Sequence, residues 1–326
     1  MPTKPHLLVV ATGGTIAMRL DPASGGPVPA LTGAELVAAV PPLATLAEVQ
    51  VEEFANIPSE HMTPEFWLRL ARRLQALLAQ GWADGVVILH GTDTMEETAF
   101  FLDIVLPGET PIVLTGAMRA ATDPNPDGPA NLLDAATVAL HPESRGRGVL
   151  IVMNGQIHSA RRGTKVDTSD LDAFESVQPP DLGRVRSGWV QFSQAWTPHV
   201  HVPLPERLPR VDIIPMYAGV DDFALAAALE RGAAGLVIAS VGAGNVNEAL
   251  YQGILKALAA GVPVVISSRV PFGRVRPIYA YAGGGVALQR AGAIFANDLN
   301  PQKSRVLLMV GLGAGYDREG LARLFE

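Results

Sequence analysis

The sequence predicts an α/β protein with a larger N-terminal and a smaller C-terminal domain, each built on a mainly parallel sheet flanked by helices. Short, continuous runs of Val, Ile and Leu recur along the chain, as they do in buried parallel strands. Helical patterns separate these runs, and such alternation is typical of α/β folds. The length of 326 residues exceeds what one hydrophobic core usually holds, so we expect two domains.

A Pro-rich, polar stretch marks the expected boundary between the domains. Residues 196–210 carry four prolines and have the composition of a linker. We therefore expect an N-terminal domain over residues 1–195 and a C-terminal domain over residues 211–326.

The composition excludes several functional classes. Hydrophobic residues make up 48% and charged residues 17%, as in a globular protein. The net charge of −7 argues against a nucleic-acid groove, which needs basic patches. The chain has no cysteine, so disulfides and a Cys nucleophile are excluded. No signal-peptide pattern or membrane-length apolar run occurs, so we expect a cytoplasmic protein with no membrane partner.

The first strand is expected over residues 6–11 and leads into a glycine-rich turn at residues 12–17. Two adjacent glycines let this turn approach a ligand closely, with Thr15 at its tip. Residues 19–31 are rich in Gly and Pro. They predict either a mobile loop that covers an active site or a plain connector.

Two helices and a strand are expected next. A capping box at residues 32–35 predicts a short helix. Alternation of apolar and polar residues predicts a strand at residues 49–54. Thr63 and Pro64 are typical of a helix cap and a first helical residue, and the apolar stripe that follows runs through Leu78.

The turn after the apolar run at residues 84–89 is the centre of the prediction. Thr94 and Glu97 match a capping box at the start of the next helix. Thr92 and Asp93 would then lie on a short turn between strand and helix. Ligands bind at this end of the strands in open α/β sheets, and the turn offers a hydroxyl, a carboxylate and unpaired backbone N–H groups.

Beyond this turn, the pattern predicts two more buried strands joined by a helix, and then a hairpin that leads to Lys165. These elements are expected at residues 111–114, 148–153, 131–140 and 155–160.

In the C-terminal part, three apolar runs alternate with two helical patterns, which predicts a β-α-β-α-β unit with a parallel sheet. Asn300 and Pro301 predict the start of another helix. The strands are expected at residues 211–217, 235–240 and 262–267, and the helices at residues 222–231 and 247–260.

Common catalytic and cofactor motifs are absent or incomplete. The nucleophile elbow, the HExxH zinc motif and the P-loop do not occur. The seven histidines are scattered, so we expect no metal site. Residues 242–247 lie where a dinucleotide fingerprint would, but Asn247 replaces its third glycine. We therefore expect no cofactor.

What remains is a set of small hydroxyls and carboxylates at strand ends, namely Thr15, Ser59, Thr92 and Asp93. A single Thr in such a place is commonly a helix cap. Several of them in glycine-rich turns of one sheet favour a catalytic site. A Thr nucleophile needs an activating base, and without Cys or a suitable His the candidates are a desolvated Lys, such as Lys165, or a Tyr.

Residues 11–17 and 90–97 form two specific signatures, and further characteristic segments lie at residues 116–119, 127–129, 164–165 and 299–303. Together they resemble bacterial-type L-asparaginases (the asparaginase/glutaminase family) over essentially the whole chain. The resemblance implies hydrolysis of the side-chain amide of L-asparagine, and in some members of glutamine, to the acid and ammonia. It also implies a catalytic N-terminal domain, no metal or cofactor, and a homodimer or homotetramer.

The resemblance also implies roles for individual residues. Thr15 would be the nucleophile that forms an acyl-enzyme. Thr92, Asp93 and Lys165 would form a second catalytic group, in which Lys165 eases deprotonation of the Thr92 hydroxyl or its bound water. Backbone N–H groups in the Gly14 and Gly91 turns would stabilise the oxyanion.

Substrate recognition follows from the same resemblance and agrees with the chemistry of the amino acid. Asparagine is a zwitterion, so its site needs carboxylates and anion-binding hydroxyls. Asp93, beside Thr92, and Glu60 would hold the α-ammonium group, and Ser59 would bind the α-carboxylate. Asn245 matches a residue that in related proteins reaches the site of a neighbouring subunit.

The chain departs from the family pattern at two places. Residues 19–34 contain no Tyr, whereas the family usually has one there beside the nucleophile. Tyr279 and Tyr281 are candidates to replace it. The Glu that other members contribute from a neighbouring subunit has no clear match near residues 272–285.

Three alternative functions remain. The first is an enzyme that prefers glutamine or accepts both amides. The second is the asparaginase-like subunit of a tRNA-dependent amidotransferase, which the acidic charge and the missing N-terminal domain disfavour. The third is an amino-acid-binding protein of low activity.

Overall fold

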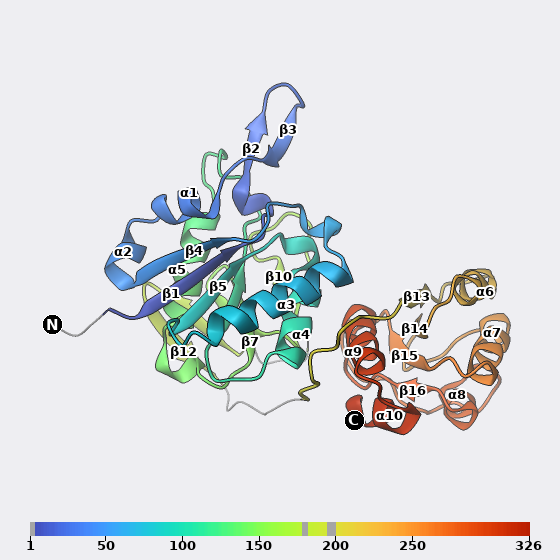
Figure 1. The fold of residues 1–326 in the computed structure, drawn as a ribbon. Helices are drawn as coiled ribbons and strands as arrows, with labels where there is room; N and C mark the ends of the chain where they lie inside the picture. The colour runs from blue at the N-terminus through green and yellow to red at the C-terminus, as the bar shows by residue number, and fades with distance from the viewer. Residues whose placement is uncertain (1–3, 178–181, 194–199) are drawn as a thin grey trace. The chain divides into compact units, whose positions relative to one another are not determined.

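The computed structural model describes residues 4–177, 182–193 and 200–326. The chain divides into two compact units, Met1–His201 and Val202–Glu326, each with its own core. Both are α/β units with sheets flanked by helices, as expected (Figure 1). Residues 196–199 of the expected linker lie outside the described residues, so its bounds stay a prediction.

An eight-stranded sheet forms the centre of the N-terminal unit, in the order β12-β11-β8-β7-β6-β5-β1-β4. The neighbouring strands β4, β1, β5, β6 and β7 run parallel. The strands β8, β11 and β12 each pair antiparallel with the strand before them in the sheet. The strands are β1 (His6–Ala11), β4 (Glu48–Glu53), β5 (Gly85–Leu89), β6 (Ile112–Thr115), β7 (Val149–Met153), β8 (Gln156–Ser159), β11 (Gly183–Arg186) and β12 (Trp189–Phe192).

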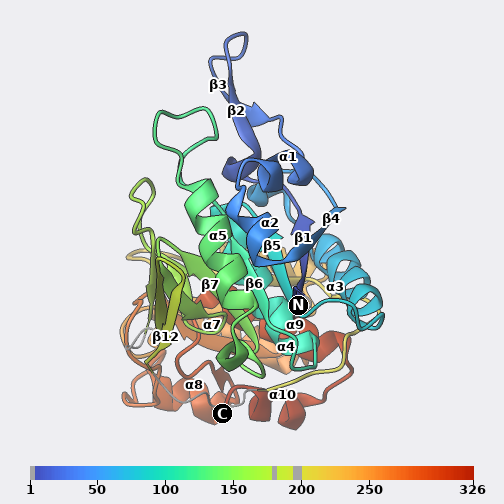
Figure 2. The same ribbon diagram turned by 90° about the vertical axis from the view of Figure 1, so that its left-hand side faces the viewer.

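Helices cover both faces of this sheet, as Figure 2 shows for α5 and α3 on its opposite sides. The side chains of α1, α2 and α5 share one apolar cluster with alternate residues of β1 and β5, as the two-residue period of a strand requires. The helices are α1 (Gly33–Ala38), α2 (Pro42–Leu46), α3 (Pro64–Leu78), α4 (Met95–Val105) and α5 (Gly128–Ala139), with short 3-10 turns η1 (Thr15–Ala17), η2 (Ser59–His61), η3 (Thr92–Thr94) and η4 (Pro142–Ser144).

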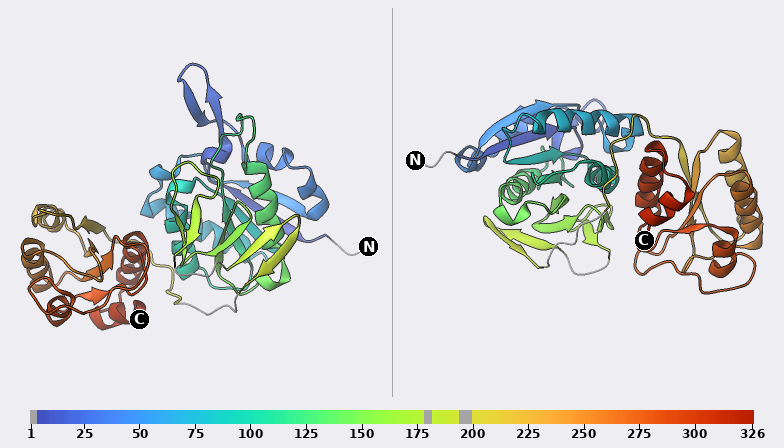
Figure 3. Two further views of the ribbon diagram at one scale, coloured as in Figure 1. Left: turned by 180° about the vertical axis from the view of Figure 1, so that it is seen from behind. Right: turned by 60° about the horizontal axis from the view of Figure 1, so that its bottom comes forward.

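The C-terminal unit has a four-stranded parallel sheet in the order β13-β14-β15-β16. Figure 3 shows the red α9 and the orange helices on opposite sides of this sheet. The expected β-α-β-α-β unit is confirmed. The elements of the whole C-terminal unit are β13 (Val211–Pro215), α6 (Phe223–Glu230), β14 (Gly235–Ser240), α7 (Glu248–Ala259), β15 (Val264–Ser268), α8 (Gly285–Ala291), β16 (Ile294–Phe295), α9 (Pro301–Gly313) and α10 (Arg318–Leu324), of which the first five form the expected unit.

Three of the expected helix caps are confirmed. Thr32 and Glu35 form a reciprocal capping box at α1. The Thr63 hydroxyl accepts a hydrogen bond from the Phe66 amide at 3.3 Å. The Asn300 side chain accepts one from the Lys303 amide at 2.9 Å. These contacts satisfy amide donors that a helix start leaves free.

The loop expected at residues 19–31 has regular structure, whereas its expected mobility and its role as a cover for an active site stay predictions. The segment forms an antiparallel hairpin of β2 (Met18–Asp21) and β3 (Gly26–Pro29). The Asp21 carboxylate accepts the amides of Ala23 and Ser24, and Gly25 adopts a left-handed conformation with φ of 74°. An Asp-centred turn that ends on such a glycine reverses the chain, and this holds the two short strands together.

The parallel pairing brings four loops to one edge of the N-terminal sheet. Ala11 of β1 pairs with Glu53 of β4 and with Leu89 of β5, and Leu89 pairs with Thr115 of β6. The chain therefore leaves these four neighbouring strands at the same level. Hydrogen bonds extend the ladder into the loops, since the Thr12 amide and hydroxyl both donate to the Leu89 carbonyl, at 3.0 and 2.8 Å.

Glycines allow these loops to touch. A Cβ added to Gly14 would lie 2.3 Å from the Cα and N atoms of Gly91, closer than non-bonded atoms approach. A Cβ added to Gly91 would lie 2.7 Å from the Ser59 hydroxyl oxygen, and one on Gly116 would lie 2.4 Å from the His90 carbonyl oxygen. The loops after β1, β4, β5 and β6 therefore form one packed cluster whose contacts leave no room for side chains.

We predict that Gly14→Ala destabilises the N-terminal unit by about 3 kcal/mol or more, because it adds a backbone clash to the strain of a φ of 90°. Gly25→Ala is the matched control. Its φ is also positive, but nothing lies within 4 Å of the added methyl group, so we expect about 1–2 kcal/mol.

All four tryptophans lie in residues 1–201, so urea unfolding followed by tryptophan fluorescence reports on this unit. Equal losses of stability in the two variants would contradict the contact between the loops.

Candidate active site

The loops at the carboxyl edge of the N-terminal sheet carry most of the predicted site residues. Thr15 starts η1, Ser59 and Glu60 lie in η2, and Thr92 and Asp93 lie in η3. Ser59 and Thr92 are buried, Thr15 is half-buried, and Glu60 and Asp93 are exposed. The cluster thus offers hydroxyls on packed turns and carboxylates that face solvent.

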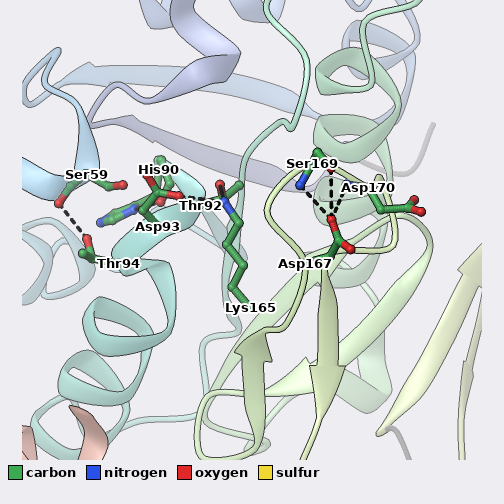
Figure 4. A network of polar contacts seen from close by, with 10 residues as sticks. Ser59, His90, Thr92, Asp93, Thr94, Lys165, Asp167, Ser169 and Asp170 are labelled. Atoms are coloured by element: carbon green, nitrogen blue, oxygen red, sulfur yellow. Dashed lines mark hydrogen bonds and ion pairs between the residues drawn. The ribbon is translucent and has the colours of Figure 1, made fainter. Parts of the chain in front are cut away.

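Lys165 reaches this cluster from a separate small sheet. It ends β9 (Gly163–Lys165), which pairs antiparallel with β10 (Phe174–Ser176). Its Nζ donates to the Thr92 Oγ1 at 2.8 Å and to the Asp93 carboxylate at 2.7 Å (Figure 4). Only 17% of the Lys165 side chain is exposed, against 62% for Asp93. A positive charge held against the Thr92 oxygen stabilises any negative charge that develops there.

A second acidic group lies near this lysine. Hydrogen bonds from the amides of Asp170 and Ser169 lower the pKa of Asp167, and the positive charge of Lys165 adds a smaller effect. The loop after β9 therefore carries a negative charge that Lys165 feels, and Figure 4 shows Asp167 with its contacts in this loop.

The expected capping box at Thr94 and Glu97 was wrong. Thr94 makes no side-chain cap to α4. Its hydroxyl instead donates to the Ser59 carbonyl at 2.7 Å. This hydrogen bond ties the η2 turn to the η3 turn. Thr94 thus holds Ser59 beside Thr92 and Asp93.

Thr15 and Thr92 share one structural feature. Thr15 follows Gly14 and Thr92 follows Gly91, and these two glycines pack against each other. In the described part of the chain, neither threonine amide has a hydrogen-bond acceptor. Two N–H groups on adjoining turns can together donate to one oxygen of a bound molecule.

Asp127 and Asn131 hold the fourth loop, where the sequence pattern indicated only a turn cluster and a characteristic segment. The Asp127 carboxylate accepts the amides of Met118 and Arg119, each at 2.9 Å, and the Asn131 side chain donates to the Gly116 carbonyl at 3.0 Å. These contacts fix the loop whose Gly116 packs against the Thr92 turn.

His90 is another residue that sequence reasoning did not assign to the site. Its side chain is fully buried, and its Nδ1 lies 2.7 Å from the Gly91 carbonyl oxygen. Burial lowers the pKa of His90 to about 4, although the hydrogen bond to Gly91 opposes this shift. The ring is therefore neutral at neutral pH.

The remaining predicted residues lie in the C-terminal unit. Asn245 closes a tight turn after β14, where its amide donates to the Val241 carbonyl and its carbonyl accepts the Val241 amide. Tyr279 and Tyr281 are partly exposed and lie with their ring centroids 5.8 Å apart. Their roles in a site stay predictions.

Within residues 4–177, 182–193 and 200–326, no cluster of three or more His, Asp or Glu side chains has the arrangement of a metal site. No helix in the same ranges is long and apolar enough to cross a membrane.

Known proteins match the chain from end to end. The family models described as "Asparaginase, N-terminal" and "Glutaminase/Asparaginase C-terminal domain" match residues 6–198 and 210–325. A probable L-asparaginase of Deinococcus radiodurans is 44% identical, over 98% of this chain and 97% of that protein. A probable periplasmic L-asparaginase of Haemophilus influenzae is 38% identical, over 99% of this chain and 93% of that protein.

A solved structure has the same fold. The crystal structure of a probable cytoplasmic L-asparaginase from Campylobacter jejuni superposes with a TM-score of 0.90 at 38% identity, and the match covers 99% of both chains. Because the relatives include a cytoplasmic and a periplasmic protein, the cytoplasmic location expected for this chain stays a prediction. The resemblance found in the sequence is confirmed at the level of both domains and of the fold, and the chain belongs to the asparaginase family.

Proposed function

We propose that the protein hydrolyses the side-chain amide of L-asparagine to L-aspartate and ammonia through an acyl-enzyme on Thr15. The observation that carries this proposal is the contact of Lys165 with Thr92 and Asp93, next to the packed turns of Gly14 and Gly91. Membership of the asparaginase family supports the reaction class.

The reaction would proceed in two steps. The Thr15 hydroxyl oxygen adds to the side-chain carbonyl carbon, the C–N bond breaks, and the nitrogen leaves as ammonia after taking a proton. A water molecule then attacks the resulting ester, which releases aspartate and restores the Thr15 hydroxyl. Thr92 would relay the proton, because its oxygen takes up the Thr15 proton as its own proton passes to the leaving nitrogen. The charge of Lys165 lowers the cost of deprotonating the Thr92 hydroxyl or its bound water.

The amides of Thr15 and Thr92, which have no acceptor within residues 4–177, 182–193 and 200–326, would stabilise the oxyanion that forms in each step. Preformed donors of this kind cost no reorganisation during the reaction and are usually a large contribution to catalysis. The contact between Gly14 and Gly91 supports this role, since it brings the two amides onto adjoining turns.

Recognition of the substrate would use charge on both ends of the amino acid. Asp93 and Glu60 are exposed carboxylates that suit the α-ammonium group, and the Ser59 hydroxyl suits the α-carboxylate. A site of this kind favours the zwitterion over uncharged amides, because such amides offer no ammonium group to the two carboxylates. Asn245 would complete the site from a neighbouring subunit, within the homodimer or homotetramer that we propose.

We predict that Thr15→Ala lowers kcat for ammonia release from L-asparagine by on the order of 10³-fold or more, because it removes the attacking oxygen. Thr15→Ser keeps a hydroxyl and is the matched control, for which we expect a much smaller loss. L-Glutamine, assayed beside L-asparagine, tests the preference between the two amides. A Thr15→Ala variant with the rate of the unmodified protein would refute the assignment of the nucleophile.

We also predict that Lys165→Met lowers kcat by about 10²- to 10⁴-fold, as expected for loss of a group that assists proton transfer. Lys256→Met is the matched control, because Lys256 pairs with Asp222 at 3.0 Å on an exposed surface. Such pairs contribute about 0–1 kcal/mol to stability, so we expect an unchanged kcat for this variant. Similar losses of kcat in the two variants would show that the Lys165 contact has no special role in the reaction.

A further inference from the structure

His90 is placed to control one peptide group of the site. It follows the last residue of β5, and its buried ring turns back onto the carbonyl of the next residue, Gly91. A carbonyl oxygen only accepts, so the His90 Nδ1 at 2.7 Å must carry the proton of the neutral ring. The Nε2 atom is then an acceptor, and it has no hydrogen-bond partner in the described part of the chain.

The hydrogen bond fixes more than the carbonyl. The peptide between Gly91 and Thr92 is planar and trans, so its C=O and N–H groups point in opposite directions. Holding the Gly91 oxygen toward His90 therefore aims the Thr92 N–H away from His90. This is the N–H that has no acceptor in the described structure.

The orientation of this peptide needs a restraint, because its carbonyl belongs to a glycine. Gly91 has no Cβ, and its close contacts with Ser59 and Gly14 exclude one. Without a Cβ, the backbone can rotate more freely than at any other residue type. The buried His90 ring restrains the orientation of the Gly91–Thr92 peptide, which a side chain on residue 91 cannot do.

We infer that His90 is a positioning residue, which holds the Gly91–Thr92 peptide so that the Thr92 N–H donates to the oxyanion of the reaction. The inference rests on the proposed amide hydrolysis. His90 itself would touch neither substrate nor nucleophile. A role in packing alone explains the ring less well, because an apolar side chain would fill the space without burying an unpartnered acceptor.

The test compares His90→Leu with His90→Asn. Leucine removes the donor, whereas the Asn side-chain amide can place an N–H close to the position of Nδ1. We expect kcat of His90→Leu to fall by about 10- to 100-fold, somewhat less than the loss of a whole oxyanion donor. We expect KM for L-asparagine and the Kd of L-aspartate to change little, since the oxyanion forms only during the reaction. His90→Asn should recover most of kcat.

Ser144→Ala controls for stability. It also removes a buried hydrogen bond, from Ser144 to the Val138 carbonyl at 2.6 Å, beyond the far end of α5. Its thermal midpoint should fall while kcat stays unchanged. Equal losses of kcat in the Leu and Asn variants, or losses that follow the thermal midpoint across all three, would overturn the positioning role while leaving the proposed function intact. Absence of ammonia release by the unmodified protein would overturn both.

Discussion

The close contact of glycine turns at the carboxyl edge of the N-terminal sheet is the constraint on which the site depends. Parallel pairing of β4, β1, β5 and β6 ends these strands at one level, and glycines at positions 14, 91 and 116 let the loops pack backbone against backbone. Thr15 and Thr92 each follow one of these glycines. The fold thereby presents on adjoining turns two hydroxyls and two amides that have no acceptor among the described residues.

Charge then separates the roles of the residues around this contact. Lys165 is mostly buried and donates to both Thr92 and Asp93, whereas Asp93 remains exposed to a ligand. Thr94 and Asp127 hold the loops in place. Thr94 donates to the Ser59 carbonyl, and the Asp127 carboxylate accepts hydrogen bonds from the amides of residues 118 and 119. The residues proposed to react thus rest on a layer of hydrogen bonds from side chains that do not react.

Much of the fold could be predicted because its signals are local. Continuous apolar runs located β1, β5 and the three long strands of the C-terminal sheet, and Thr63 and Asn300 marked helix starts. The errors arose where a polar side chain had two possible partners. Thr94 bonds to Ser59 instead of capping α4, and Asp21 organises a hairpin in a segment that looked like a loop.

The site was only partly predictable for a related reason. Strand-end position and residue type pointed to Thr15, Ser59, Thr92 and Asp93, but the contact between Lys165 and Thr92 joins residues far apart in sequence and followed only from the family resemblance. The carbonyl orientation held by His90 leaves no trace in the local pattern.

The most direct test of the account is to identify the covalent intermediate. The protein would be quenched in acid during turnover of L-asparagine, digested, and analysed by mass spectrometry for a peptide that carries one aspartyl group. The account predicts this group as an ester on Thr15. An aspartyl ester on Thr92, or turnover that proceeds with no esterified peptide at any time after mixing, would contradict it.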